Sequence, residues 1–409
     1  MKSKIGKIIT SSLLAVSMIA SALPLSVSAV TKSGNTNEGD SEKPKEDSIN
    51  AMLNTVNYNK INGWQVNKET PGVSTIVGDK EPTSVGNKAA LDKELKKGGK
   101  ASNFKYININ KNIDYESNDL TIPNYTILLV NKVTLSNVKS ITLGNHVLLT
   151  GLSTNVTSSK ITGLSGGISL NTCTAINNLN ITNDTNITAK NINNIFIGGV
   201  SNDNKLNYTF TSVTNVKFTK NANIYNFTSN KSKNIRFDSV TIGGNVNITG
   251  TNNTDDCGIR FLDTTISGKT TLETTRNFTI LSCVFGKTVK ISDCSVFLFS
   301  QSGSQLNRPY VNVFNQGLDI YNSRNFLLKN SQIKAPSNRD GIPVNGCAGL
   351  NIKNNTTNNY KYFTMSNVHV NAVYIYNMQN FTIKRNCLSN KTYKLSNCKY
   401  YKNYLKISK

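Results

Sequence analysis

The sequence contains few of the side chains that most often perform acid–base and metal chemistry. Its 409 residues include 2 histidines, and 23 acidic residues stand against 46 lysines and arginines. The histidines, His146 and His369, are far apart, and no two of the 7 cysteines show the spacing of zinc ligands. These shortages argue against a zinc site.

Long apolar runs are absent after the first 30 residues. Three lysines in residues 1–7 precede an apolar run over residues 8–25, which ends in the small residues Val27-Ser28-Ala29. This order is typical of a secretory signal peptide, predicted here over residues 1–29. A membrane anchor is the weaker alternative, because Pro24 and several serines interrupt the run. The sequence therefore predicts a secreted protein, extracellular or associated with the cell surface, with no membrane span.

The scarcity of acidic residues leaves a formal net charge of +23 at pH 7. From Arg324 to the end, 14 lysines and arginines accompany a single acid, Asp340. A basic excess favours anionic partners such as acidic polysaccharides, cell-wall polymers or anionic lipids, and the predicted secretion makes nucleic acid the least favoured. Lysines that only keep an Asn-rich surface soluble produce the same composition, so charge alone identifies no site.

Composition divides the remaining chain into a linker, a cap, a repeat region and a second cap. Residues 30–50 contain almost nothing apolar, and residues 30–60 are predicted to be a disordered linker. Residues 61–104 are predicted to be an N-terminal cap with a helix near residues 87–97, because two leucines there lie four residues apart and glycine follows. Residues 105–390 are predicted to be the repeat region, and residues 391–409 a basic and aromatic C-terminal cap.

One four-residue phrase recurs in the repeat region: a polar or small residue, an apolar anchor, one outward residue and a second apolar residue. Successive anchors are 18 to 31 residues apart. This period fits turns of three short strands with polar corners, whereas a β-sandwich or a leucine-rich repeat would show a different strand spacing or a fixed Leu-x-Leu pattern. The sequence therefore predicts an all-β fold, a right-handed parallel β-helix solenoid whose anchors form one inner ladder. The nine anchors are Ile195, Val216, Ile235, Ile259, Phe278, Val296, Phe326, Leu350 and Phe381.

Asparagine and cysteine each have a structural interpretation in such a solenoid. Asn tolerates left-handed corners and can hydrogen-bond the equivalent Asn of the next turn. Most of the cysteines are predicted to be small buried residues, because free Cys packs like a compact hydrophobe. Disulfides such as Cys283–Cys294 or Cys387–Cys398 are the alternative in a secreted protein, since connectivity cannot be read from sequence.

The recurring phrase between Asn194 and Ile383, together with the capping helix before the strand-like Tyr106–Ile109, resembles the pectate-lyase-like superfamily of right-handed β-helices. The resemblance implies an elongated groove on one strand face that binds acidic polysaccharide. Lyases of this superfamily use Arg or Lys as base and carboxylates to hold calcium. The polygalacturonase pattern is not matched, because Asn338-Arg339-Asp340 only echoes its first motif and neither histidine lies in a Gly-His-Gly tripeptide.

A lyase needs a positioned base and a group that neutralises the developing enediolate. The catalytic candidates are Arg260 with Asp263, or Lys334 with Arg339 and Asp340. The Asp-Gly pair in the second set is also ordinary turn chemistry, which leaves a purely structural role open.

Calcium is the one cofactor that the resemblance suggests. Asp255 and Asp256 are the candidate ligands, near Arg260 in the sequence. They follow Asn-Asn-Thr, the composition of an exposed corner, so a plain turn is the alternative.

Three basic residues occupy the same place in successive copies of the phrase, immediately after the anchor. Lys217, Arg236 and Arg260 should therefore stack on one outer face, about 4.8 Å apart per turn. Like charges this close are unfavourable unless an anion lies along them, which predicts a substrate-binding row for a polyanion. Side chains that splay into water are the alternative.

Tyrosines are concentrated among lysines near the C-terminus. Their rings suit sugars and the lysines suit acidic substituents, whereas the alternative is that they close the final turn. These tyrosines are Tyr360, Tyr362, Tyr374, Tyr376, Tyr393, Tyr400, Tyr401 and Tyr404.

Two classes of function follow. In the first, a monomeric secreted β-helix protein binds an acidic polysaccharide or cell-wall polymer and cleaves it by β-elimination. In the second, it is a non-catalytic surface or adhesive protein whose solenoid serves as a rigid display surface. The scarcity of acids and histidines favours the second class, and the capping helix and the basic row favour the first.

Overall fold

The computed structural model describes most of the chain after residue 79. It also describes Ile76 and the backbone of two short antiparallel strands, β1 (Lys60–Ile61) and β2 (Trp64–Gln65). The predicted signal peptide and nearly all of the predicted linker lie outside the described residues and stay predictions. The main described ranges are 80–151, 158–200, 205–250, 257–300, 312–335, 349–355, 363–390 and 393–407.

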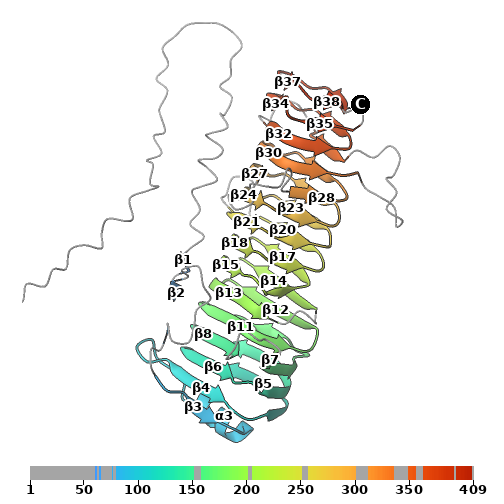
Figure 1. Cartoon of the computed structure of the whole chain (residues 1–409). Helices are drawn as coiled ribbons and strands as arrows, with labels where there is room; N and C mark the ends of the chain where they lie inside the picture. Colours follow the sequence, from blue (N-terminus) through green and yellow to red (C-terminus); the bar gives the residue numbers. More distant parts are fainter. Residues whose placement is uncertain are drawn as a thin grey trace, which may run out of the picture. The chain divides into compact units, whose positions relative to one another are not determined.

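The described chain folds into a parallel β-solenoid of about 13 turns (Figure 1). From residue 83 onward, each strand pairs in parallel with the equivalent strand of a neighbouring turn. Short runs of alternating apolar and polar residues form such strands because alternate side chains point into the interior and toward solvent. The predicted all-β parallel fold is confirmed.

The strands form three faces along the solenoid. The first face contains β3 (Thr83–Val85), β4 (Lys105–Ile109), β6 (Thr126–Val130), β8 (Val147–Gly151), β11 (Thr174–Ile181), β13 (Asn193–Val200), β15 (Thr214–Phe218), β18 (Lys233–Asp238), β21 (Ile259–Leu262), β24 (Arg276–Leu281), β27 (Ser295–Ser300), β30 (Arg324–Ile333), β32 (Phe363–Val370), β34 (Phe381–Ile383) and β37 (Lys402–Asn403). The second face contains most of β5 (Ile113–Ile122) and of β7 (Thr134–Leu143), then β10 (Ile168–Ser169), β12 (Thr185–Lys190), β14 (Leu206–Thr211), β17 (Asn226–Asn230), β20 (Val246–Thr249), β23 (Thr270–Glu273), β26 (Val289–Ser292), β29 (Leu318–Tyr321), β31 (Leu350–Lys353), β33 (Val373–Tyr376) and β36 (Tyr393–Ser396). The third face contains the starts of β5 and β7, β9 (Lys160–Gly163), the end of β11, β16 (Asn223–Ile224), β19 (Thr241–Ile242), β22 (Thr265–Ile266), β25 (Val284–Phe285), β28 (Asn312–Phe314), the ends of β30 and β32, β35 (Leu388–Ser389) and β38 (Lys406–Ile407).

The predicted anchors of the first face stack in the interior. Ile195 pairs with Val216, and Val216 pairs with Ile235. Aromatic rings continue the stack, as between Phe297 and Phe326, whose ring centroids are 4.7 Å apart. The predicted anchors that occupy this ladder are Ile195, Val216, Ile235, Ile259, Phe278, Phe326 and Phe381.

The sequence prediction is wrong for two of the nine anchors. Phe278 pairs with Phe297 and not with Val296, because Val296 occupies the left-handed corner (φ 55°) that precedes the anchor. Leu350 belongs to β31 on the second face, and the first-face position is held by Phe363. A short alternating phrase does not distinguish the faces, because all of them show the same period of two.

Asparagines hold the corner that precedes the first face. Asn194, Asn215 and Asn234 have φ values of 64°, 61° and 61°, in the left-handed region that Asn tolerates. Asn215 Nδ2 donates a hydrogen bond to Asn194 Oδ1 at 2.9 Å, and Asn234 Nδ2 donates to Asn215 Oδ1 at 2.7 Å. The predicted bonding of Asn to Asn between turns is therefore confirmed.

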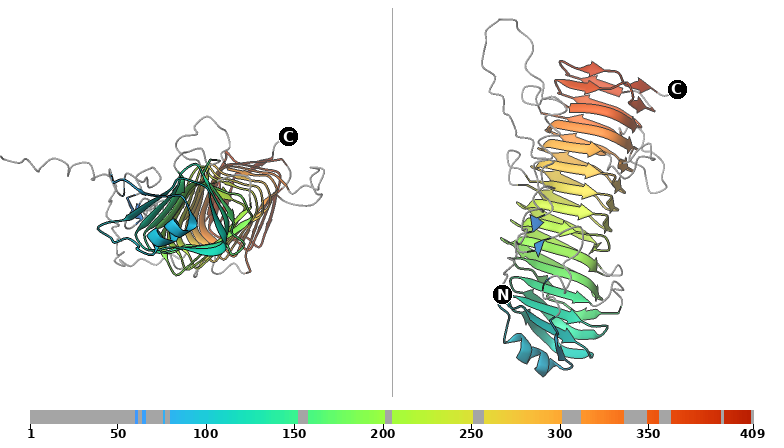
Figure 2. Two further views of the ribbon diagram at one scale, coloured as in Figure 1. Left: turned by 90° about the horizontal axis from the view of Figure 1, so that it is seen from below. Right: turned by 60° about the vertical axis from the view of Figure 1, so that its left-hand side comes forward.

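Helix α3 (Lys88–Leu95) covers the N-terminal end of the solenoid, as Figure 2 shows. Asn87 caps this helix, because its side-chain oxygen accepts a hydrogen bond from the Ala90 amide at 2.9 Å. Leu91 and Leu95 are buried in the same core as the first turns. The predicted capping helix is confirmed.

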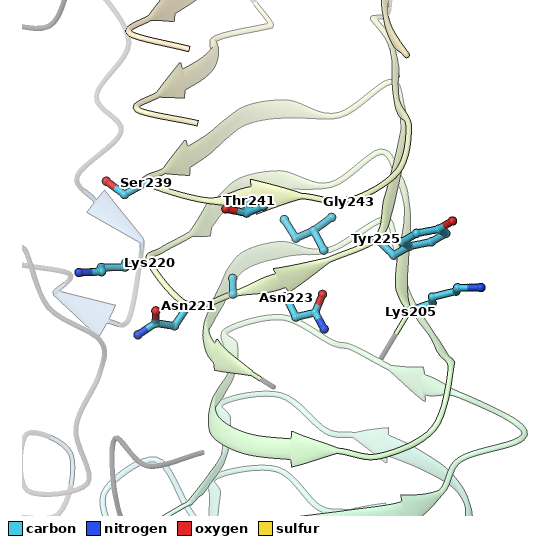
Figure 3. A pocket seen from close by; sticks show the side chains of 10 residues that line it. Lys205, Lys220, Asn221, Asn223, Tyr225, Ser239, Thr241 and Gly243 are labelled. Carbon is cyan, nitrogen blue, oxygen red and sulfur yellow. The ribbon is translucent and has the colours of Figure 1, made fainter. Parts of the chain in front are cut away.

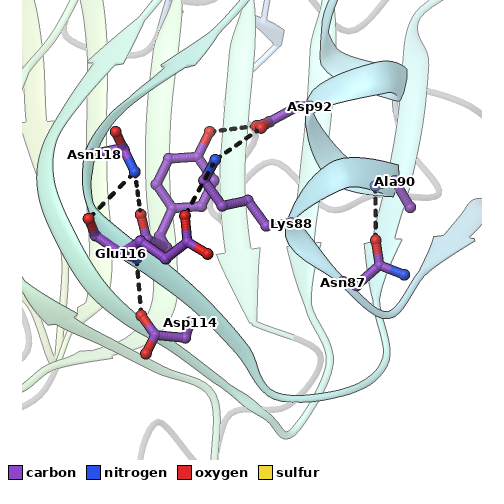
Figure 4. A network of polar contacts seen from close by, with 8 residues as sticks. Asn87, Lys88, Ala90, Asp92, Asp114, Glu116 and Asn118 are labelled. Atoms are coloured by element: carbon purple, nitrogen blue, oxygen red, sulfur yellow. Dashed lines mark hydrogen bonds and ion pairs between the residues drawn. The ribbon is translucent and has the colours of Figure 1, made fainter.

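Polar contacts join α3 to strand β5 (Figure 4). The Tyr115 hydroxyl donates a hydrogen bond to Asp92 Oδ1 at 2.6 Å. Lys88 Nζ lies 3.4 Å from Asp92 Oδ2 and 3.7 Å from Glu116 Oε2. Burial, followed by the hydrogen bond to Asp92, raises the pKa of the Tyr115 hydroxyl well above its usual range. The cap is thus attached by polar as well as apolar contacts.

Six of the seven cysteines lie within the described residues. Neither Cys283–Cys294 nor Cys387–Cys398 forms a disulfide. Burial raises the pKa of the Cys283 and Cys294 thiols to about 12. The prediction of small buried cysteines is confirmed for Cys173, Cys257, Cys283, Cys294 and Cys387, and Cys398 is half-buried.

Candidate functional site

The predicted basic row lies on the outer side of the first face. Lys217 in β15 pairs with Arg236 in β18, and Arg236 pairs with Arg260 in β21. Neighbouring strands of a sheet lie about 4.8 Å apart, so the three residues occupy successive turns in one register. The stacking follows the sequence prediction, and the binding of a polyanion stays a prediction.

A carboxylate that was not predicted, Asp238, joins this basic row. Arg236 Nε donates a hydrogen bond to Asp238 Oδ1 at 2.5 Å, and Lys217 Nζ lies 4.0 Å from Asp238 Oδ2. Only 6% of Lys217 is exposed, and burial lowers the pKa of its ammonium group, while Asp238 acts in the opposite direction. The spacing of two residues between Arg236 and Asp238 is the signal that could have revealed the pair, because such residues share one side of a strand. The row is therefore partly neutralised within the protein.

The described catalytic candidates come from the two alternative predicted sets, Arg260 with Asp263 and, of the second set, Lys334. Arg260 lies within β21, and Asp263 occupies the left-handed corner after this strand (φ 47°). Lys334 follows the third-face end of β30, where its amide donates to the Phe314 carbonyl at 2.9 Å. Three strand spacings of one ladder separate β21 from β30, about 14 Å along the axis. Arg260 therefore lies on the first face and Lys334 lies after a third-face strand, so the two alternative sets occupy different places on the solenoid and their catalytic roles stay predictions.

The remaining candidates, Asp255, Asp256, Arg339 and Asp340, lie outside the described residues. The proposed calcium ligands and the second catalytic set therefore stay predictions. Within the described ranges, no three His, Cys, Asp or Glu side chains are grouped so that they could hold a metal ion. None of the described helices has the length and apolar character needed to cross a membrane.

A pocket of about 580 Å³ lies on the third face, next to the basic row (Figure 3). Lys220 follows Lys217 by three residues and Ser239 follows Arg236 by three, so the chain turns from the row into the pocket. In Figure 3, Lys220 lies at one end of the pocket and Tyr225 at the other. The lining residues are Lys205, Lys220, Asn221, Ala222, Asn223, Ile224, Tyr225, Ser239, Thr241 and Gly243.

Two backbone features shape this pocket. Asn221 adopts a left-handed φ of 69° where the chain turns toward β16. Gly243 lies against the Tyr225 ring, and a Cβ at this position would be only 3.3 Å from Tyr225 Cδ2. Glycine therefore leaves room for the ring. Lys205 Nζ lies 5.4 Å from the centroid of the same ring, a favourable cation–π arrangement.

The pocket combines two ammonium groups, one aromatic ring, hydroxyls and side-chain amides, and none of its described lining residues is acidic. A ring provides a surface for stacking, the hydroxyls and amides provide hydrogen bonds, and the lysines attract an anion. The sequence prediction missed this pocket because its residues come from successive turns and share no short motif.

Comparison of the chain with protein-family models, with curated proteins and with solved structures gives no match. The fold and the site define the protein at the level of class. It is a parallel β-solenoid that carries a polar, cationic pocket on its wall.

Proposed function

We propose that the protein is a secreted β-solenoid that binds an anionic polysaccharide in the pocket around Tyr225. The observation that carries this proposal is the placement of Lys205 and Lys220 in a pocket whose described lining contains no carboxylate. A pyranose ring packs on Tyr225, and a carboxylate of the polymer meets an ammonium group. The neighbouring hydroxyls and amides bond the sugar hydroxyls.

The basic row supports the same kind of partner. It leads into the pocket along the chain, and the whole protein carries a net charge of +23. A strongly basic surface raises the rate at which polyanions are captured, most of all at low salt. The hydrogen bond from Arg236 to Asp238 holds one guanidinium of the row in a fixed orientation.

Isothermal titration calorimetry with oligogalacturonate tests the pocket. The double variant Lys205→Ala/Lys220→Ala should bind at least about 10-fold more weakly, because charge-assisted contacts are lost. The control Lys269→Ala/Lys287→Ala removes the same charge from exposed residues outside the pocket and should bind within about 2-fold of the wild type. Equal losses of affinity in both variants would mean that binding is non-specific charge attraction, which would contradict the assignment of the pocket as the binding site.

Cleavage by β-elimination extends this proposal, with the chain as a distant member of the pectate-lyase-like superfamily. The parallel solenoid and the capping helix support the relationship. Arg260, as the neutral guanidine, is the candidate base: it takes the proton beside the uronate carboxylate, the neighbouring C–O bond breaks as a double bond forms, and the leaving sugar oxygen takes a proton from water. Ultraviolet absorbance of the unsaturated product, followed on polygalacturonate with calcium, measures the reaction, and Arg260→Ala should abolish it.

A non-catalytic surface or adhesive protein is the second candidate function. The scarcity of acidic residues and histidines, 23 and 2 in the whole sequence, favours it, because few side chains are then suited to acid–base work or to holding calcium. Retained polysaccharide binding with no unsaturated product across a panel of uronic-acid polymers would support this function over the lyase.

A further inference from the structure

The outer side of the second face carries lysines and tyrosines in its last turns. The strands β26, β29, β31, β33 and β36 pair in unbroken register, so their outward residues form two columns. We call six of these residues the Lys–Tyr track: Lys290, Tyr321, Lys353, Tyr374, Tyr376 and Lys394.

The track is regular in both directions. The columns are two residues apart on each strand, about 7 Å, and the five strands extend about 19 Å along the axis. Lys290 Nζ lies 5.8 Å from the ring centroid of Tyr321, and Lys353 Nζ lies 5.5 Å from that of Tyr376. Each of these pairs therefore presents an ammonium group beside an aromatic ring.

Positive charge dominates this surface. Lys290 and Lys394 are exposed and Lys353 is half-buried. Asp319 is the acid within the two columns, and its Oδ1 already accepts a hydrogen bond from Asn351 Nδ2 at 2.7 Å. The surface is thus complementary to a polymer that repeats both a ring and a negative charge.

We infer that the Lys–Tyr track is a second binding surface, for an extended uronic-acid polysaccharide that lies along the solenoid axis. The choice of polymer rests on the proposed function, but the track lies on another face and begins two turns beyond the pocket. Tyrosine rings pack on pyranose rings, and the lysines meet the carboxylates. A phosphate polymer without rings would use the lysines alone, so the tyrosines favour the polyuronate.

Affinity electrophoresis of the full chain through gels that contain polygalacturonate tests the track. The variant Lys290→Ser/Lys353→Ser/Lys394→Ser should bind at least about 10-fold more weakly. The variant Tyr321→Thr/Tyr374→Thr/Tyr376→Thr keeps strand-forming residues and should bind about 5-fold more weakly. Against polyglycerol phosphate, the lysine variant should lose retention and the tyrosine variant should not. Thermal midpoints by circular dichroism confirm that both variants fold.

The control Lys190→Ser/Lys269→Ser/Lys287→Ser removes three exposed charges elsewhere and should migrate like the wild type. An equal loss of polygalacturonate binding in this control would contradict the proposal that the Lys–Tyr track binds the polymer. A tyrosine variant that binds polygalacturonate as tightly as the wild type would contradict it as well.

The pocket variant Lys205→Ala/Lys220→Ala separates the two proposals. If only this variant loses binding, the proposed role of the Lys–Tyr track is wrong and the proposed function stands. If only the track variants lose binding, the track stands and the pocket assignment fails. If the wild type does not retain polygalacturonate, both are wrong.

Discussion

The N-terminal and C-terminal turns of the second face have the same backbone arrangement but present different side chains to solvent. In the N-terminal turns, one outward column consists of hydroxyl side chains, whereas the C-terminal turns carry the Lys–Tyr track. Inward residues must fill a close-packed interior, but outward residues are free of this constraint. One ladder can therefore change its surface chemistry without a change of fold. The hydroxyl column contains Thr121, Thr142, Ser169, Thr188, Thr209 and Thr228.

The two ends of the solenoid also differ. At the N-terminal end Leu91 of α3 is 0% exposed, whereas near the C-terminal end Tyr400 is 71% exposed and Ile407 is 50% exposed. Tyr401 stacks on Phe381 with ring centroids 5.0 Å apart. Two of the clustered tyrosines, Tyr374 and Tyr376, belong to the track, while Tyr401 covers the interior as the alternative interpretation predicted.

The largest expected effect is on stability, and it should distinguish inward from outward positions in both regions. Phe210→Ala in the N-terminal turns and Ile291→Ala in the C-terminal turns should each lower the free energy of unfolding by about 2–5 kcal/mol, because both side chains are fully buried. The outward neighbours, changed as Thr209→Ala and Lys290→Ser, should alter it by less than about 0.5 kcal/mol. Guanidinium denaturation measures all four variants, and equal costs for inward and outward changes would contradict the comparison.

Thiol reactivity should distinguish the middle turns from the last ones. Burial holds the pKa of Cys283 and Cys294 at about 12, so almost no thiolate forms at pH 8. Cys398 is half-buried in the last turns and should react with iodoacetamide at least about 10-fold faster. Mass spectrometry of the labelled peptides measures each site, and uniform labelling of the folded protein would disprove this order.

The N-terminal cap should contribute stability that depends on pH. Hydrogen bonds from Lys105 and then Lys97 lower the pKa of Glu94 from 4.5 to about 2, so its stabilising effect is complete above pH 4.5 and is lost as pH falls through 2. Glu94→Gln should lower the free energy of unfolding at pH 7 by about 1 kcal/mol, and the difference should shrink toward pH 2. Denaturation curves at the two pH values test this, and a constant difference would refute the proposed ion-pair contribution.

The smallest expected effect comes from a transfer of surface chemistry. The variant Thr188→Lys/Thr209→Tyr/Thr228→Lys places track residues on the hydroxyl column, where all three positions are exposed. It should raise the affinity for polygalacturonate about 3-fold, because only part of a track is built. The matched variant with Ser at the same three positions should show no gain in affinity. Equal retention of the two variants on polygalacturonate would mean that these side chains alone do not turn the hydroxyl column into a binding surface.

The sequence by itself determined the fold class, because the features that specify it are local. Alternating anchors such as Ile195 and Val216, left-handed corners at Asn194 and Asn215, and a capped helix are each defined within a few residues. The stacking of Lys217, Arg236 and Arg260 follows from the same repeat. The anchors and the left-handed corners recur from turn to turn, so single errors do not obscure them.

Only the tertiary structure decided which residues of different turns meet where the repeat is irregular in spacing or carries no recurring phrase. Loops of variable length change the sequence spacing between equivalent residues, and the alternating phrase is alike on every face, so the phrase alone misplaced Val296 and Leu350. The same reason hid the pocket around Tyr225 and the Lys–Tyr track, whose members are far apart in the sequence and are brought together by the pairing of strands.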